Sequence, residues 1–165
     1  MRQVSFAGTK TLLAAIVIAA GFSGPSLTIN AETSVLKRTK RPVFSDLRAQ
    51  TKEFIGYADS MSLAPEQQKV KEAVLSGIPA PCCKKFSAAT CCCPCNMAKS
   101  IWGLSNFMLL RHGANAEELR AAVEAWIRVI NPSGFTGDAC DKKGGCERPF
   151  ADNGCAGMDQ DRVIF

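Results

Sequence analysis

The sequence of 165 residues has a single histidine, His112. A metal site built on several histidines is therefore excluded, and the lone imidazole argues against a hydrolase that needs a Ser/His/Asp set. No glycine-rich loop with the pattern of a phosphate cradle is present. These absences argue against a hydrolase and favour a protein that is not an enzyme, although they do not decide between the two.

Long hydrophobic runs are also scarce. The run from Leu12 to Ala20 is too short for a membrane span, which needs ~20 apolar residues. Arg2 and Lys10 precede it and small or turn residues follow, a pattern typical of a secretory signal. We predict that residues 1–31 are this signal, cleaved after Ala31, and that the protein is exported to the periplasm or the extracellular space. The alternative is an uncleaved signal anchor, which would be the protein's one attachment to a membrane.

Charge of one sign is not in large excess. The chain has 20 Lys and Arg against 15 Asp and Glu, and removal of the signal leaves 18 against 15. This balance is too mild to indicate nucleic acid, so no nucleic-acid partner is expected.

Apolar periodicity and capping residues predict a mainly α fold. Residues 32–62 are polar and mixed, which indicates a linker or a partly ordered segment with a short helix near Ser45–Tyr57. The cysteine-rich helical domain covers residues 63–165, and its first firm helix runs from Pro65 to Ser76, with proline at the start and Gly77 after the end.

Two further helices are expected to form an antiparallel hairpin. One spans about 97–112 after an Asn96 cap, and the other spans about 116–130 after the capping box of Asn115 and Glu118. A short connection through residues 112–114 makes them neighbours. From residue 132 to 165 the chain has no useful period. The expected architecture is a small helical bundle with an irregular, cysteine-containing C-terminal segment.

The chain holds nine cysteines, all between Cys82 and Cys155. An odd number cannot pair completely into disulfides. Six cysteines crowd the region before the helix predicted at about 97–112, and three lie in the irregular segment. The first group is Cys82, Cys83, Cys91, Cys92, Cys93 and Cys95; the second is Cys140, Cys146 and Cys155.

Metal binding is the first chemistry that this pattern indicates. Thiolates are soft ligands that select Cu(I), Zn(II) or heavier soft ions. Adjacent cysteines suit a multinuclear cluster better than one tetrahedral site, because neighbouring side chains usually point apart. We expect Cys91, Cys92, Cys93 and Cys95 as metal ligands, completed by Cys82 and Cys83, in a protein for metal transport, storage or detoxification. Its partners would be the metal ion and a metal-transport or redox protein.

Two alternatives remain open. Cys92 and Cys95 have the spacing of a redox pair, and Cys95 precedes a helix, whose N-terminus lowers the pKa of a thiol. The protein would then be a thiol–disulfide oxidoreductase. Alternatively the cysteines are staples in a binding module, with Cys140, Cys146 and Cys155 as disulfide candidates that tie the C-terminal segment back to residues 82–95.

Two resemblances accompany this pattern, each over roughly residues 78–130. The segments Ile78–Cys83 and Cys91–Cys95 resemble those of exported bacterial proteins named for a PCYCGC motif, whose cysteines imply metal handling. The pair Cys92 and Cys95, followed by a helical hairpin, is similar to the thiol reductases of cytochrome c maturation. That second resemblance implies disulfide reduction by Cys92 and Cys95.

Overall fold

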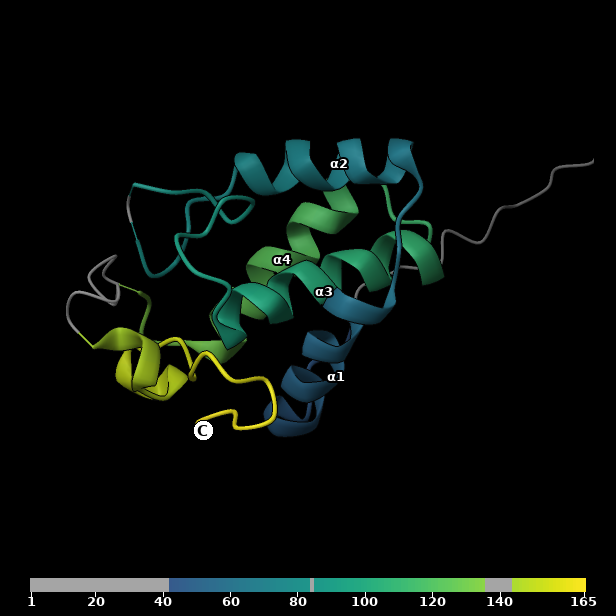
Figure 1. Ribbon diagram of the computed structural model, residues 1–165. Helices are drawn as coiled ribbons and strands as arrows, with labels where there is room; N and C mark the ends of the chain where they lie inside the picture. Colours follow the sequence, from purple (N-terminus) through teal and green to yellow (C-terminus); the bar gives the residue numbers. More distant parts are fainter. Residues whose placement is uncertain (1–41, 84, 136–143) are drawn as a thin grey trace, which may run out of the picture. The chain divides into compact units, whose positions relative to one another are not determined.

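In the computed structural model, described for residues 42–83, 85–135 and 144–165, four α-helices form a small bundle (Figure 1). The predicted mainly α fold is thereby confirmed. The helices are α1 (Leu47–Ser60), α2 (Pro65–Ser76), α3 (Asn96–Arg111) and α4 (Ala116–Ile130). Two short 3-10 turns, η2 (Gly145–Glu147) and η3 (Phe150–Asp152), follow in the C-terminal segment.

Helix α3 is central, because it contacts each of the other three helices. Its closest neighbour is α1, which crosses it at Gly103. A Cβ atom at Gly103 would lie 1.6 Å from the carbonyl oxygen of Phe54, so only glycine allows the two backbones to approach this closely. Phe54 and Ile55 are buried at this crossing. Helix α1 lies at the place of the short helix predicted near Ser45–Tyr57, within the segment 32–62, and it packs into the core.

Helices α3 and α4 form the predicted hairpin. Asn115 caps α4 through the expected reciprocal bonds with Glu118, each 2.9 Å long. Trp126, near the end of α4, donates from Nε1 to the hydroxyl of Ser100, near the start of α3, at 3.0 Å. The two helices therefore run in opposite senses. Trp126 is fully buried against the ring of Phe54, which joins the hairpin to α1.

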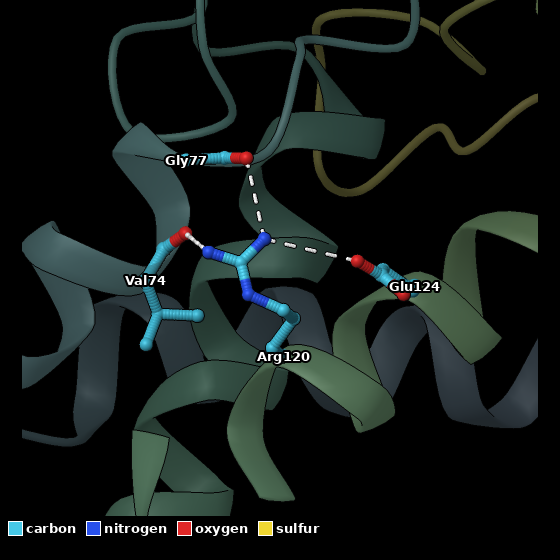
Figure 2. A network of polar contacts seen from close by, with 4 residues as sticks. All are labelled: Val74, Gly77, Arg120 and Glu124. Carbon is cyan, nitrogen blue, oxygen red and sulfur yellow. Dashed lines mark hydrogen bonds and ion pairs between the residues drawn. The ribbon is translucent and has the colours of Figure 1, made fainter. Parts of the chain in front are cut away.

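The end of α2 is held by Arg120 of α4 (Figure 2). The guanidinium donates to the carbonyl oxygens of Gly77 at 3.2 Å and of Val74 at 3.5 Å, and it pairs with Glu124 at 3.8 Å. The carbonyl of Val74 also accepts from the N–H of Gly77 at 3.2 Å. A cation at the C-terminal end of α2 gives these carbonyls a further donor and interacts favourably with the helix dipole. Arg120 thereby fixes where the chain leaves α2 toward Cys82.

The C-terminal segment docks on the start of α3. The backbone N–H of Asn96 donates to the carbonyl of Gly157 at 2.9 Å, and that of Met97 donates to the carbonyl of Cys155 at 3.2 Å. The sequence predicts Asn96 as the N-cap, but Cys95 is the N-cap and Asn96 is the first helical residue. The correction has a physical reason: the Asn96 side chain is buried and donates to the carbonyls of Ala156 and Asp159 instead of capping its own helix.

The predicted signal, residues 1–31, lies outside the described residues, as do its cleavage site and the anchor alternative. Among the helices of the described ranges, none has both the length and the apolar character required to cross a membrane.

Candidate thiol site

A network of thiols lies at the start of α3, where three segments of the chain meet. At its centre, Cys155 of the C-terminal segment shares side-chain hydrogen bonds with Cys82 and Cys95. All three side chains are fully buried. Cys82 follows the extended arm after α2, where the N–H of Ala88 donates to the carbonyl of Ile78 at 2.8 Å. We call Cys82, Cys95 and Cys155 the inner thiols.

The hydrogen bonds divide the inner thiols by charge. The bond with Cys155 lowers the pKa of the Cys82 thiol, and a second bond, with Cys91, adds to this effect. The same contacts raise the pKa of the two donors: Cys155 through Cys82 and Cys95, and Cys91 through Cys82 and then burial. These contacts therefore favour the thiolate form at Cys82 and Cys95 and the protonated form at Cys91 and Cys155.

Cys95 has a second source of stabilisation, because it is the N-cap of α3. Its pKa is lowered by the hydrogen bond with Cys155 and also by the backbone N–H of Ala98. The first turn of a helix leaves such N–H groups without backbone partners, and they favour negative charge. In the first turn of α3, the N–H groups of Asn96 and Met97 donate to carbonyls of the docked segment, and the N–H of Lys99 donates to the carbonyl of Cys95 at 2.9 Å.

The outer part of the network contains Cys92, Cys93 and Cys146. The Sγ atom of Cys93 lies 3.8 Å from the Sγ atom of Cys146 in η2, and also 3.8 Å from that of Cys92. Cys92 is exposed and Cys93 is half-buried, so this part of the network faces solvent. The pKa of Cys93 is raised by burial and then by the negative charge on Cys95. Cys95 also shares a hydrogen bond with Cys93, which links the outer thiols to the inner ones.

The structure brings together five of the six cysteines predicted as metal ligands, namely Cys82, Cys91, Cys92, Cys93 and Cys95. The sixth, Cys83, is buried in a tight turn, where its N–H donates to Ala80 at 3.3 Å and its carbonyl accepts from Phe86 at 3.2 Å. Cys140, a disulfide candidate, lies outside the described residues.

Two members of the network were not expected as part of the metal site. Cys146 and Cys155 were disulfide candidates of the C-terminal segment, and the structure places both among the thiols at the start of α3. The expected return of this segment to residues 82–95 does occur, but nothing in the cysteine spacing indicates which thiols meet. Among the described cysteines, no pair is joined by a disulfide.

His112 is at the opposite end of α3 from this network. It follows the last residue of a helix of 16 residues, and its ring packs edge-to-face on Phe107. At a rise of 1.5 Å per residue, the two ends of α3 are about 24 Å apart. His112 therefore cannot join the thiols as a ligand.

The distances suit metal coordination only in part. Zinc–sulfur bonds of about 2.3 Å in a tetrahedron place neighbouring sulfurs about 3.8 Å apart, which matches the Cys93 contacts with Cys92 and Cys146. However, over the described ranges no three Cys, His, Asp or Glu side chains are arranged to hold one metal ion. The described sulfurs contact one another as a connected series and do not surround a single point. Metal binding requires that protons leave and that side chains turn toward a shared ion.

Comparison of the chain with family models, with curated proteins and with solved structures finds no match. The function is therefore argued from the site alone.

Proposed function

We propose that this protein binds a soft metal ion, Cu(I) or Zn(II), through the thiol network at the start of α3, as cargo in metal transport, storage or detoxification. The observation that carries the proposal is the meeting of Cys82, Cys95 and Cys155, from three separate segments, in one buried contact. Thiolates select soft ions, and the network adds Cys91, Cys92, Cys93 and Cys146 as further donors.

The arrangement favours several bridged ions over one enclosed ion. Sulfurs that contact one another in succession can each bridge two metal ions, whereas a single tetrahedral site needs four sulfurs around one point. Cys82 and Cys95 already favour the thiolate form, which is the form that binds metal. Cys91, Cys93 and Cys155 hold their protons and would release them as metal enters.

The burial of Cys95 argues against the oxidoreductase alternative. A thiol that attacks the disulfide of a protein substrate must be accessible to that substrate. Cys92 is exposed, but the pair member with the lowered pKa, Cys95, is fully buried and engaged with Cys155. The lowered pKa of Cys95 is explained by its place in the network and does not by itself indicate catalysis.

Metal loading of the reduced chain tests the proposal. Full-length protein is purified under reducing, anaerobic conditions, titrated with Cu(I) or Zn(II), desalted and analysed for bound metal. The matched control is the same protein with all thiols alkylated under denaturing conditions and then exchanged into the same buffer. We expect one or more equivalents of Cu(I) or Zn(II) that the control does not retain. Uptake below about a tenth of an equivalent of both ions would overturn the proposal.

The same preparation also tests the alternative function, a thiol–disulfide oxidoreductase. Catalysed reduction of a disulfide-bonded test peptide, with turnover lost in Cys92→Ser, would establish thiol–disulfide exchange. Metal binding without such turnover is the result that the proposal predicts.

A further inference from the structure

Cys93 and Cys146 are two outer thiols that come from separate segments and contact each other. Cys93 lies in the loop that leads into α3, and Cys146 lies in η2, 53 residues further along the chain. Their Sγ atoms are 3.8 Å apart. A disulfide has a bond of about 2.05 Å, so the two sulfurs must close by about 1.8 Å, which small side-chain rotations can supply.

The backbone around Cys146 holds its thiol at this distance. The N–H of Gly157 donates to the carbonyl of Cys146 at 2.7 Å, and the N–H of Cys155 donates to the carbonyl of Gly145 at 2.8 Å. The carbonyls of Cys155 and Gly157 in turn accept from the first two N–H groups of α3. A short chain of hydrogen bonds thus connects η2 to the helix that Cys93 precedes.

Access distinguishes Cys93 from the inner thiols, whereas its partner Cys146 is buried. Cys93 is half-buried, so a small oxidised thiol compound reaches it from solvent. Cys82, Cys95 and Cys155 are fully buried, which shields them from the same reagent.

A disulfide between Cys92 and Cys93 is excluded for a different reason. Cys92 and Cys93 also place their sulfurs 3.8 Å apart, but they are adjacent in the chain. A disulfide between adjacent residues closes a small ring that contains their peptide bond, and it distorts the planar trans geometry of that bond.

We propose that Cys93 and Cys146 are joined by a disulfide in the oxidised protein, and that this bond fastens the C-terminal segment to the entry of α3. The proposal goes beyond the proposed function and does not depend on it. Cys82, Cys95 and Cys155 stay reduced in this form.

The oxidant is an organic disulfide such as oxidised glutathione. One of the two thiols first loses its proton to solvent, and the resulting thiolate attacks a sulfur of this disulfide and forms a mixed disulfide, with release of one glutathione thiolate. The second thiolate then attacks the protein sulfur of the mixed disulfide and releases the other glutathione. Two protein thiols lose two electrons and two protons, and one oxidised glutathione becomes two reduced ones.

The test is a peptide map of the full chain. Reduced, metal-free protein is equilibrated with a glutathione buffer, alkylated, and digested with trypsin and a glutamyl endopeptidase. The fragment Gly144–Glu147 then carries Cys146 alone, and Phe86–Lys99 carries Cys91, Cys92, Cys93 and Cys95. We expect a cross-link between these two fragments, assigned to Cys93 by tandem mass spectrometry, with Cys82 and Cys155 alkylated as thiols after unfolding.

Single cysteine substitutions test whether the cross-link joins Cys93 to Cys146. The cross-link falls by about tenfold or more in Cys93→Ser and in Cys146→Ser, and it stays within about twofold of the wild type in the matched control Cys92→Ser. Far-UV circular dichroism of each variant shows whether its helices are retained. A dominant cross-link of Cys146 to Cys140, Cys92 or Cys95, or an undiminished yield in Cys93→Ser, would overturn the proposal. Because these samples contain no metal, failure here is distinct from failure of metal loading.

Discussion

The buried side chain of Asn96 donates from Nδ2 to the carbonyl oxygen of Ala156 at 2.9 Å, across 60 residues of sequence. A second bond from the same Nδ2, to the carbonyl of Asp159, is 2.8 Å long. One amide of α3 therefore satisfies two carbonyls of a segment whose described part contains just two short 3-10 turns. This contact positions Cys155 beside Cys82 and Cys95.

Loss of the Asn96 amide should weaken the docking of the C-terminal segment. Asn96→Ala removes one hydrogen bond from each carbonyl, while Ala156 still accepts from the N–H of Ile164 at 3.0 Å and Asp159 from that of Arg162 at 3.2 Å. The loss of two hydrogen bonds at about 0.5–1.5 kcal/mol each should cost about 1–3 kcal/mol. We expect urea denaturation of the reduced protein to show a loss in this range. The matched control is Lys99→Ala, which removes an exposed bond of 3.2 Å to the same segment, at the carbonyl of Met158. Its cost should be below about 0.5 kcal/mol, and equal losses in the two variants would contradict the account.

The crossing of α1 and α3 should tolerate no side chain at Gly103. Gly103→Ala places a methyl group against the carbonyl of Phe54, so the helices must separate, at a cost of about 1–3 kcal/mol or more. The matched control is Gly56→Ala on α1, where an added Cβ meets no atom within 4 Å. Alanine there should stabilise the helix by up to about 1 kcal/mol. Thermal denaturation of both variants checks these opposite signs, and a neutral Gly103→Ala would show that the helices cross less closely.

The helices show how far the sequence alone predicts this fold. Local signals, proline at the start of α2 and the box of Asn115 and Glu118 before α4, place helix starts correctly because their physical causes lie within one turn. The helix predicted near Ser45–Tyr57 corresponds to α1, but its place in the core could not be predicted, because its burial depends on contact with Gly103, more than 40 residues away. The docking of the C-terminal segment depends on backbone carbonyls, which every sequence has. The roles of Cys146 and Cys155 in the thiol network therefore could not be predicted.

The inner thiols should give the reduced, metal-free protein a pH-dependent stability. The pKa of Cys82 is below its ordinary value of 9.0 in the folded state, so below pH 9.0 the unfolded chain binds a proton that the folded chain lacks. Stability from this group rises with pH toward 9.0, by at most about 1.4 kcal/mol per pH unit, and is lost as pH falls. The pKa of Cys155 is raised in the folded state, so above pH 9.0 the folded chain keeps a proton that the unfolded chain loses. The contribution of Cys155 to stability therefore declines as pH rises above 9.0.

Denaturation from about pH 6 to pH 10, with a chelator and reductant present, checks this behaviour. Cys82→Ala should flatten the rise below pH 9.0, and Cys155→Ala should flatten the decline above it. Matching pH profiles in the wild type and both variants would show that the thiols do not share protons as the structure indicates.

Oxidation should stabilise the protein if Cys93 and Cys146 pair. Their separation of 53 residues closes a long loop, and restriction of the unfolded chain by such a loop contributes about 4 kcal/mol. The melting temperature should therefore rise after treatment with oxidised glutathione. Cys146→Ser should lack this rise while Cys92→Ser keeps it. A rise that persists in Cys146→Ser would assign the stabilisation to a different pair.

The most direct test of the thiol network as a metal site is a Cu(I) titration of the reduced full-length chain against a chromophoric chelator, in three forms. Cys155→Ser removes the thiol that contacts both Cys82 and Cys95, and Cys83→Ser removes a buried thiol in the turn beside the network. We predict that Cys155→Ser weakens Cu(I) binding by about tenfold or more and that Cys83→Ser changes it by less than about twofold. Equal affinities in all three proteins, or no competition with the chelator by any of them, would contradict the account.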